Sequence, residues 1–325
     1  MPGKKLKKKE AKQAKKSKTR KTVYTTVAAA VVVVIVIAAY FAVTYTDPLV
    51  KYIGTPISNA FYSELYSVAN SPYNVTPLFT NHTPVALSSI IFDNNQSPWM
   101  SSGKPIIVFI GGEYCPHCAL TRWPLTLALL RFGNFTGLKY MLSTNNDIDP
   151  NTPTFTYLGS TYSSPYIVFQ PFEAFDRSAN PLQTVPSNYS TVWSTLTGGA
   201  DSVPFVDFAN VYVASGLPID PTGWNSYNWT QILSQIQQNE TFISSQAEAY
   251  ANVFTAVICK LDSNKPANVC GLGVIKHLEN ELGGKAYSPL SVNLTTGYPN
   301  NTVAMWTTVQ YSQIEWIRNS SVKTR

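Results

Sequence analysis

Residues 106–118, IIVFIGGEYCPHC, constrain the fold of this chain more than any other stretch. An apolar run typical of a buried strand, residues 106–110, ends at two glycines, and two cysteines spaced C-x-x-C follow. Beyond the second cysteine, apolar side chains recur at helical spacing, at Leu120, Trp123, Leu127 and Leu130. This order of strand, tight turn, cysteine pair and helix predicts an α/β domain with the cysteines where the helix begins.

The start of a helix gives the two cysteines different chemistry. Free N–H groups and the helix dipole stabilise a thiolate at Cys115. Its pKa can fall from about 8.5 to between about 3.5 and 7, which makes it the attacking sulfur in thiol–disulfide exchange. Cys118, one turn on, can then resolve a mixed disulfide. The alternatives are a structural short-loop disulfide or half of a zinc site, which needs two more soft ligands nearby.

The segment Cys115-Pro116-His117-Cys118 resembles the active site of the thioredoxin superfamily, with the Pro-His dipeptide of its periplasmic disulfide-oxidase branch. The resemblance implies a thioredoxin-like fold, in which His117 helps to stabilise the thiolate and the disulfide is strongly oxidising. It also implies a cis-proline loop that faces the cysteines and precedes the next strand. Val203-Pro204, followed by FVDFANVYV, fits that loop, so Pro204 is expected to shape the groove for client chains.

One position departs from that family. Thioredoxins carry a buried acid on the strand six residues before the first cysteine, and here that position is Phe109. A proton-relay role could pass to Glu113, but the sequence does not show that it does.

The N-terminus combines a basic tail with a charge-free apolar segment. Eleven of the 24 Lys and Arg residues and one of the 18 acidic residues lie in residues 1–21, which leaves 13 basic and 17 acidic side chains elsewhere. No basic patch therefore suggests nucleic-acid binding by the body.

Residues 22–46, at about 1.5 Å each, can cross a hydrocarbon core of about 30 Å. The positive-inside rule predicts a cytoplasmic tail, an uncleaved single-pass anchor and a body outside the cell membrane; cleavage near Ala38-Ala39 is the alternative.

Two further features agree with a body outside the cell. The four cysteines form an even set, as disulfide pairing in an oxidising compartment needs. Ten N-x-S/T sequons are candidate glycosylation sites, at Asn74, Asn81, Asn95, Asn134, Asn188, Asn228, Asn239, Asn293, Asn300 and Asn319.

The body divides into three predicted parts. Residues 47–103 are expected to form a stalk or a wrapping N-terminal extension, with a helix near 57–69 and an edge strand or short helix at 86–92. The thioredoxin-like domain is predicted over residues 104–282, and a C-terminal extension over 283–325.

Within residues 104–282, we expect core strands at 105–110, 138–143, 205–208 and 211–213, and helices at 115–132, 229–238, 241–260 and 271–282. A large insertion is predicted at about 145–200, because prolines and aromatic residues alternate there. It is expected to carry a strand at 166–169 and not to be helical. Its aromatic residues could pack a core or line a groove for client chains.

The second pair of cysteines, Cys259 and Cys270, flanks a connection between two predicted helices that contains Pro266. A disulfide closing a loop of this size stabilises a fold by about 3 kcal/mol in the chain-entropy account. We predict a structural disulfide; a second exchange pair that relays electrons is the alternative.

The whole chain also resembles an uncharacterised archaeal family of membrane-anchored thioredoxin-like proteins, over most of residues 20–280. Our first hypothesis is a membrane-anchored thiol–disulfide oxidoreductase that forms or isomerises disulfides in exported client proteins, with a membrane redox partner and without metal or cofactor. The alternatives are a non-catalytic cell-surface binding or structural module, or a metallochaperone that uses the same cysteines.

Overall fold

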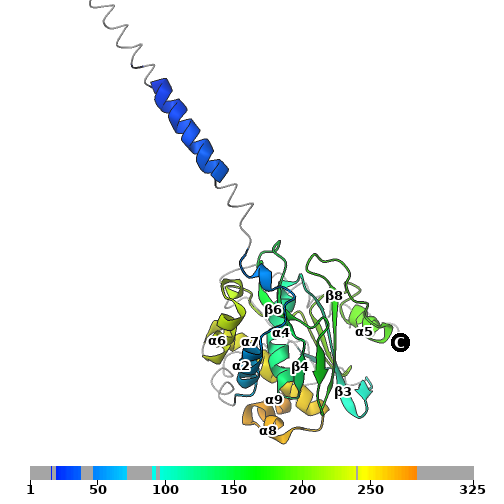
Figure 1. Ribbon diagram of the computed structural model, residues 1–325. Helices are drawn as coiled ribbons and strands as arrows, with labels where there is room; N and C mark the ends of the chain where they lie inside the picture. The colour runs from blue at the N-terminus through cyan, green and yellow to red at the C-terminus, as the bar shows by residue number, and fades with distance from the viewer. Residues whose placement is uncertain are drawn as a thin grey trace, which may run out of the picture. The chain divides into compact units, whose positions relative to one another are not determined.

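A computed structural model describes residues 16, 20–37, 47–71, 90–92, 96–238 and 241–283 (Figure 1). The chain splits into two compact units, Met1–Val50 and Lys51–Arg325, and each is considered by itself. The predicted C-terminal extension falls outside the described residues, except for its first residue.

The N-terminal unit contains a helix, Arg20–Ile37, that is long and apolar enough to cross a membrane. Its 18 residues reach about 27 Å at 1.5 Å per residue. The hydroxyl of Thr26 donates to the carbonyl of Thr22, so this polar group is satisfied within the helix. The remainder of the predicted anchor, residues 38–46, lies outside the described part of the chain.

The second unit is built on a curled, mixed sheet in the order β1–β10–β9–β3, with β8 on the other side of β3. β8 runs parallel to β3, whereas β9 is antiparallel to β3, and β10 and β1 continue the antiparallel part. A short strand, β2, forms a hairpin with the start of β3. The strands span Ile90–Phe92 (β1), Met100–Ser101 (β2), Lys104–Gly112 (β3), Val168–Phe175 (β8), Phe205–Phe208 (β9) and Tyr212–Ser215 (β10).

The central strand β3 is buried on both faces, which explains its continuous apolar sequence. On one face, Val108 and Ile110 pack with Tyr189 and Trp193 of α5 (Ser187–Leu196). On the other face, Phe109 lies next to the helix α4 (Pro116–Leu130) that follows the cysteines. Figure 1 shows α5 on one side of the sheet and α4 with α7 on the other.

The helix α7 (Phe242–Leu261) fills the core behind α4 and is buried for almost its whole length. Ala249, Val253, Phe254 and Val257, which recur at helical spacing in the helix predicted at 241–260, are buried. Phe242, at the first position, is 50% exposed. Shorter helices also contact α7: α6 (Trp229–Gln237), α8 (Ala267–Cys270) and α9 (Gly273–Gly283). The 3-10 turn η3 (Trp224–Ser226) precedes α6.

Residues 51–71, which belong to the second unit, pack against the body rather than form a stalk. After the turn η1 (Val50–Tyr52), backbone hydrogen bonds join Gly54 and Thr55 to Tyr140. The helix α2 (Asn59–Ala69), predicted at 57–69, starts at Ser58, whose hydroxyl accepts from the Phe61 N–H. β1 is an edge strand, one of the two predicted alternatives for residues 86–92.

The strand predicted at 138–143 is present as β5 (Lys139–Leu142), but its predicted place in the core sheet was wrong. β5 pairs with β6 (Pro153–Thr156) in a separate two-stranded sheet, and its Lys139 also forms an isolated bridge with Pro56. β4 (Asn134–Thr136) pairs with β7 (Thr161–Ser163) in another two-stranded sheet. The place beside β3 is taken by β8, from within the predicted insertion. Pro171 fits there because β8 is an edge strand of the sheet. The same segment also contains α5, so the expectation of a non-helical insertion was wrong as well.

Candidate functional site

The two cysteines of the C-x-x-C segment lie at the start of α4, where the sequence predicted them. Cys115 is the N-cap residue, and its Sγ accepts a hydrogen bond from the Cys118 N–H at 3.2 Å. Pro116 occupies the first turn, where its missing N–H costs nothing. Both thiols are free, so the structure represents the reduced pair.

The two cysteine residues are both buried but differ slightly in exposure. Cys115 is 7% exposed, whereas Cys118 is fully buried at 0%. The Sγ of Cys118 accepts a hydrogen bond from the Gly112 N–H at 3.4 Å, at the end of β3. Of the two cysteines, Cys115 is therefore the one closer to the surface.

The predicted proline loop lies against Cys115. The Val203–Pro204 peptide bond is cis, as the resemblance implied. The carbonyl oxygen of Val203 is 3.9 Å from the Sγ of Cys115, across 88 residues of sequence. The register of β9 on β3, which pairs Phe205 with Ile110, brings the two segments together.

The surroundings shift the pKa values of the two thiols in opposite directions. The pKa of Cys115 is lowered, mainly by a hydrogen bond from the Cys118 side chain, then by the Cys118 N–H, the charge of Arg122 and the His117 N–H, against the effect of burial. The pKa of Cys118 is raised well above its usual value by burial and by the neighbouring Cys115. Cys115 therefore ionises first, as an attacking cysteine must.

His117 contributes differently from the expectation. Burial lowers the pKa of its imidazole, and the opposing effect of Asp149 and Asp147 is smaller. The neutral ring is therefore favoured at neutral pH, and the hydrogen bond to Cys115 that lowers the thiol pKa comes from the His117 backbone N–H. Charge stabilisation by a protonated His117 is confined to acidic pH.

A buried ion pair that the sequence analysis missed lies beside the cysteines. Arg122 of α4 and Glu173 of β8 are both 0% exposed, with Arg122 Nη2 2.5 Å from Glu173 Oε2. Arg122 is the only Lys, Arg, Asp or Glu of α4, and Glu173 is the only one of β8. A single charge in an otherwise apolar segment was the signal that could have identified each residue.

The two residues discussed as departures from the family both belong to the surroundings of this ion pair. Phe109 packs under the guanidinium, whose Cζ lies 5.3 Å from the ring centroid. The Oε1 of Glu113 accepts a hydrogen bond from the Thr156 hydroxyl at 2.7 Å, and burial raises the pKa of this carboxyl. Its charge interacts with Glu173 and Arg122.

The sequence profile of a family described as a domain of unknown function, DUF929, matches residues 91–260. The chain belongs to the DUF929 family. No curated protein and no solved structure matches the chain. The DUF929 match includes the cysteine pair, Arg122, Glu173 and the proline loop, so all the parts of the site described above lie within it.

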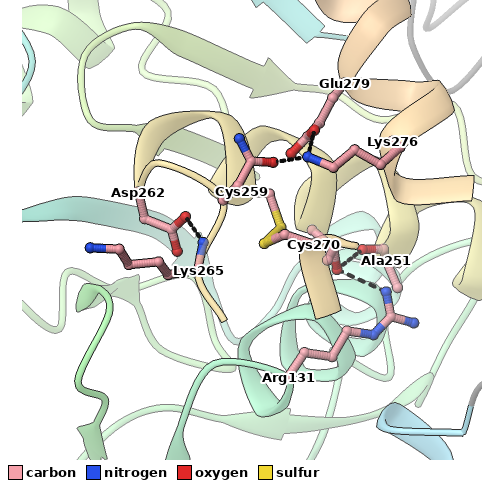
Figure 2. The surroundings of a disulfide bond; sticks show 10 residues. Arg131, Ala251, Cys259, Asp262, Lys265, Cys270, Lys276 and Glu279 are labelled. Atoms are coloured by element: carbon pink, nitrogen blue, oxygen red, sulfur yellow. Dashed lines mark hydrogen bonds and ion pairs between the residues drawn. A yellow bond between two sulfur atoms is a disulfide. The ribbon is translucent and has the colours of Figure 1, made fainter. Parts of the chain in front are cut away.

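The predicted disulfide between Cys259 and Cys270 is present, with the Cα atoms 5.6 Å apart. It joins the last turn of α7 to α8, so Cys270 lies beyond the DUF929 match. Both cysteines are fully buried. Figure 2 shows the sulfur–sulfur bond and the nearby Lys276, which forms an ion pair with Glu279 at 2.9 Å.

The other predicted sites are covered only in part. Asn134 and Asn188 are exposed, whereas Asn228 is half-buried and its side chain caps α6. The remaining seven sequons lie outside the described residues, at Asn74, Asn81, Asn95, Asn239, Asn293, Asn300 and Asn319. Within the described ranges, no three or more His, Cys, Asp or Glu side chains gather where they could hold a metal ion.

Proposed function

We propose that this protein is a membrane-anchored thiol–disulfide oxidoreductase that acts outside the cytoplasm and forms or isomerises disulfides in exported proteins. The observation that carries the proposal is the asymmetry of the cysteine pair. Cys115 is the residue closer to the surface and its thiol has a lowered pKa, whereas Cys118 is completely buried and its thiol has a raised pKa. Thiol–disulfide exchange needs this division between an attacking and a resolving sulfur.

The architecture around the pair supports a thioredoxin-like fold as part of the proposal. The strand β3 leads into the cysteines and α4 follows them. A cis-proline loop faces Cys115 and leads into β9, which pairs with β3 and is followed by β10. These are the features that the resemblance to the thioredoxin superfamily implied.

The proposed reaction starts from the Cys115–Cys118 disulfide. A client thiolate attacks the Sγ of Cys115, a client–Cys115 disulfide forms, and the bonding electron pair leaves with Cys118 as a thiolate. A second client thiolate then attacks the client sulfur and releases Cys115 as a thiolate. The client is oxidised by two electrons and the cysteine pair is reduced. A membrane redox partner accepts these electrons before the next cycle.

The location is proposed from the N-terminal segment and the second disulfide. The apolar helix follows a strongly basic tail, which favours a cytoplasmic N-terminus. The Cys259–Cys270 disulfide suits an oxidising compartment.

Alkylation and redox equilibration of the full-length protein test the proposal. We expect Cys115 to react with iodoacetamide faster than Cys118. The apparent pKa of Cys115 should lie below about 8.5, the usual value for a free cysteine. Cys115→Ser should abolish oxidation of a reduced client peptide, and Cys118→Ser should trap a mixed disulfide through Cys115. If Cys115 titrates like a free cysteine or reacts no faster than Cys118, the oxidoreductase proposal fails and a non-catalytic surface module replaces it.

A further inference from the structure

The ion pair between Arg122 and Glu173 is completely buried, and a pair of this kind adds little net stability to a fold. Arg122 Nε is 3.2 Å from Glu173 Oε1 and Arg122 Nη2 is 2.5 Å from Glu173 Oε2, so the contact is bidentate. Removing two charges from water costs several kcal/mol per ion, and an apolar pair of similar volume is often as stable. Arg122 Nη1 also has no hydrogen-bond partner among the residues that the structure describes. A role for the charge itself is therefore worth testing.

Arg122 is connected to the buried cysteine through one residue. It lies four residues after Cys118 on α4, and its Nη2 donates to the Gly112 carbonyl at 3.2 Å. The Gly112 N–H in turn donates to the Sγ of Cys118 at 3.4 Å. The end of β3 is thus held between the guanidinium and the sulfur.

The guanidinium is also fixed by its packing. The Phe109 ring lies against it, and a Cβ on Gly111 would be 2.4 Å from that ring and 3.3 Å from Arg122 Nη2. Glu173 is held in place as well, because its Oε1 accepts from the Tyr157 N–H at 3.1 Å. The positive charge therefore keeps one position relative to Cys118, without water to screen it.

We infer that Arg122 is a positioning residue for thiol–disulfide exchange, which holds a fixed positive charge that stabilises Cys118 as the leaving thiolate. The inference rests on the proposed function. When a client thiolate attacks Cys115, the negative charge moves from the client sulfur to Cys118, which is fully buried. A thiolate formed there without a nearby cation is strongly disfavoured. The charge of Arg122 lowers the pKa of both Cys118 and Cys115, which agrees with this role.

Charge variants of the full-length protein separate this role from a structural one. Arg122→Met removes the cation and leaves Glu173 unneutralised. Glu173→Gln removes the carboxylate and leaves the cation. Both break the same buried pair, so both should lower stability, whereas their effects on a Cys118 thiolate have opposite signs. The double variant, Arg122→Met with Glu173→Gln, removes both charges and avoids an unpaired buried ion.

The first measurement is the pKa of Cys118 in a Cys115→Ser background. The titration is monitored through the ultraviolet absorbance of the Cys118 thiolate. An opposite charge close to a titrating group shifts its pKa by about 1–3 units. We expect a rise of about one unit or more in Arg122→Met and in the double variant, and a fall in Glu173→Gln. This titration needs no catalysis, so it tests the role of Arg122 even if the proposed function is wrong.

The second measurement is the single-turnover rate at which glutathione cleaves the Cys115–Cys118 disulfide. A leaving thiol of higher pKa leaves more slowly, and if the Brønsted slope for the leaving thiol equals the value of about 0.5 known for attacking thiols, each pKa unit slows cleavage about threefold. Arg122→Met and the double variant should be slower by at least that factor, Glu173→Gln should be no slower than the wild type, and Arg122→Lys should recover part of the rate.

Arg131, the C-cap residue of α4, offers a matched control. It is a half-buried arginine that donates hydrogen bonds to Asn252 and Thr255, and it lies 13 residues after Cys118, about 20 Å along the helix axis. Arg131→Met should change stability but neither the Cys118 titration nor the cleavage rate.

The inference is overturned if the double variant titrates and reacts like the wild type, or if Arg122→Met and Glu173→Gln shift both readouts in the same direction. A wild-type pair that forms no cleavable disulfide would instead refute the proposed function.

Discussion

A buried carboxyl on β9 makes the stability of this protein depend on pH. Asp207 is fully buried three residues after Pro204, and it pairs in register with Val108 of β3 and Val213 of β10. Its Oδ1 accepts from the Asn210 N–H at 2.5 Å, and its Oδ2 has no hydrogen-bond partner among the described residues. Burial raises the pKa of this carboxyl from 3.8 to about 7.

The sign of the effect follows from the two pKa values. The unfolded carboxyl ionises near pH 3.8, but the folded one stays protonated until about pH 7. Between these values the unfolded state binds fewer protons, so the free energy of unfolding falls as the pH rises. At about 1.36 kcal/mol for each pKa unit, the loss over the whole window is about 4 kcal/mol. The contribution of the protonated Asp207 carboxyl to stability is therefore complete below about pH 4 and lost above about pH 7.

Asp207→Asn should remove this dependence. The side-chain amide oxygen of the variant can still accept the hydrogen bond from the Asn210 N–H. Its NH₂ group replaces the O–H donor of the protonated carboxyl. We expect the variant to match the wild type near pH 4 and to be more stable near pH 7.5 by up to about 4 kcal/mol.

Urea unfolding at a series of pH values, followed by tryptophan fluorescence, measures the difference. Trp193 packs in the same cluster as Val108 and Phe205, so its emission should report on this part of the core. The other carboxyls with a raised pKa, at Glu113, Asp149 and Asp262, are common to both proteins and cancel in the comparison. Parallel pH profiles for wild type and Asp207→Asn, or a variant that is less stable at pH 7.5, would show that the reasoning is wrong.

Three further predictions concern other parts of the chain. Replacing Cys259 and Cys270 together by serine should lower the free energy of unfolding by about 3 kcal/mol, from the 11-residue separation, and leave the reactivity of Cys115 unchanged; a change in its alkylation rate would contradict the separation of the two pairs. Protease treatment of intact cells should remove the body and spare the basic tail, and glycan on none of the ten sequons of native material would count against this topology. His117→Ala should make the cysteine couple less oxidising mainly at acidic pH, because burial lowers the pKa of the imidazole; an equal shift in redox equilibria at pH 5 and pH 8 would refute a charge effect.

Features carried by neighbouring residues could be predicted from the sequence. The continuous apolar run before Cys115 corresponds to β3, and the apolar residues at helical spacing after Cys118 correspond to α4. Both patterns are contained in a short stretch of sequence. The Cys259–Cys270 pairing follows from a short loop between two helices. The cis bond before Pro204 came from a resemblance rather than from any local pattern.

The choice of strand partners could not be predicted in the same way. Residues 138–143 and 168–175 both have the composition of a strand, but only β8 pairs with β3. A strand was predicted at 166–169, but it was placed in an insertion outside the core. That β8 is an edge strand, which accommodates Pro171, is visible only once the order of strands is known. Sheet pairing joins segments far apart in the chain, and their periodicity does not say which will meet.

The sequence alone therefore determined where the cysteines lie on their helix, the apolar character of the N-terminal helix and the second pair of cysteines, because each depends on a short run of residues. The tertiary structure decided which charges surround the site. Arg122 and Glu173 are 51 residues apart and Cys115 and Val203 are 88 apart, yet each pair is in contact. Whether a charge is buried, and whether it has a partner, depends on the segments that pack over it. For that reason the pKa values of Cys115, Cys118 and Asp207 are properties of the fold.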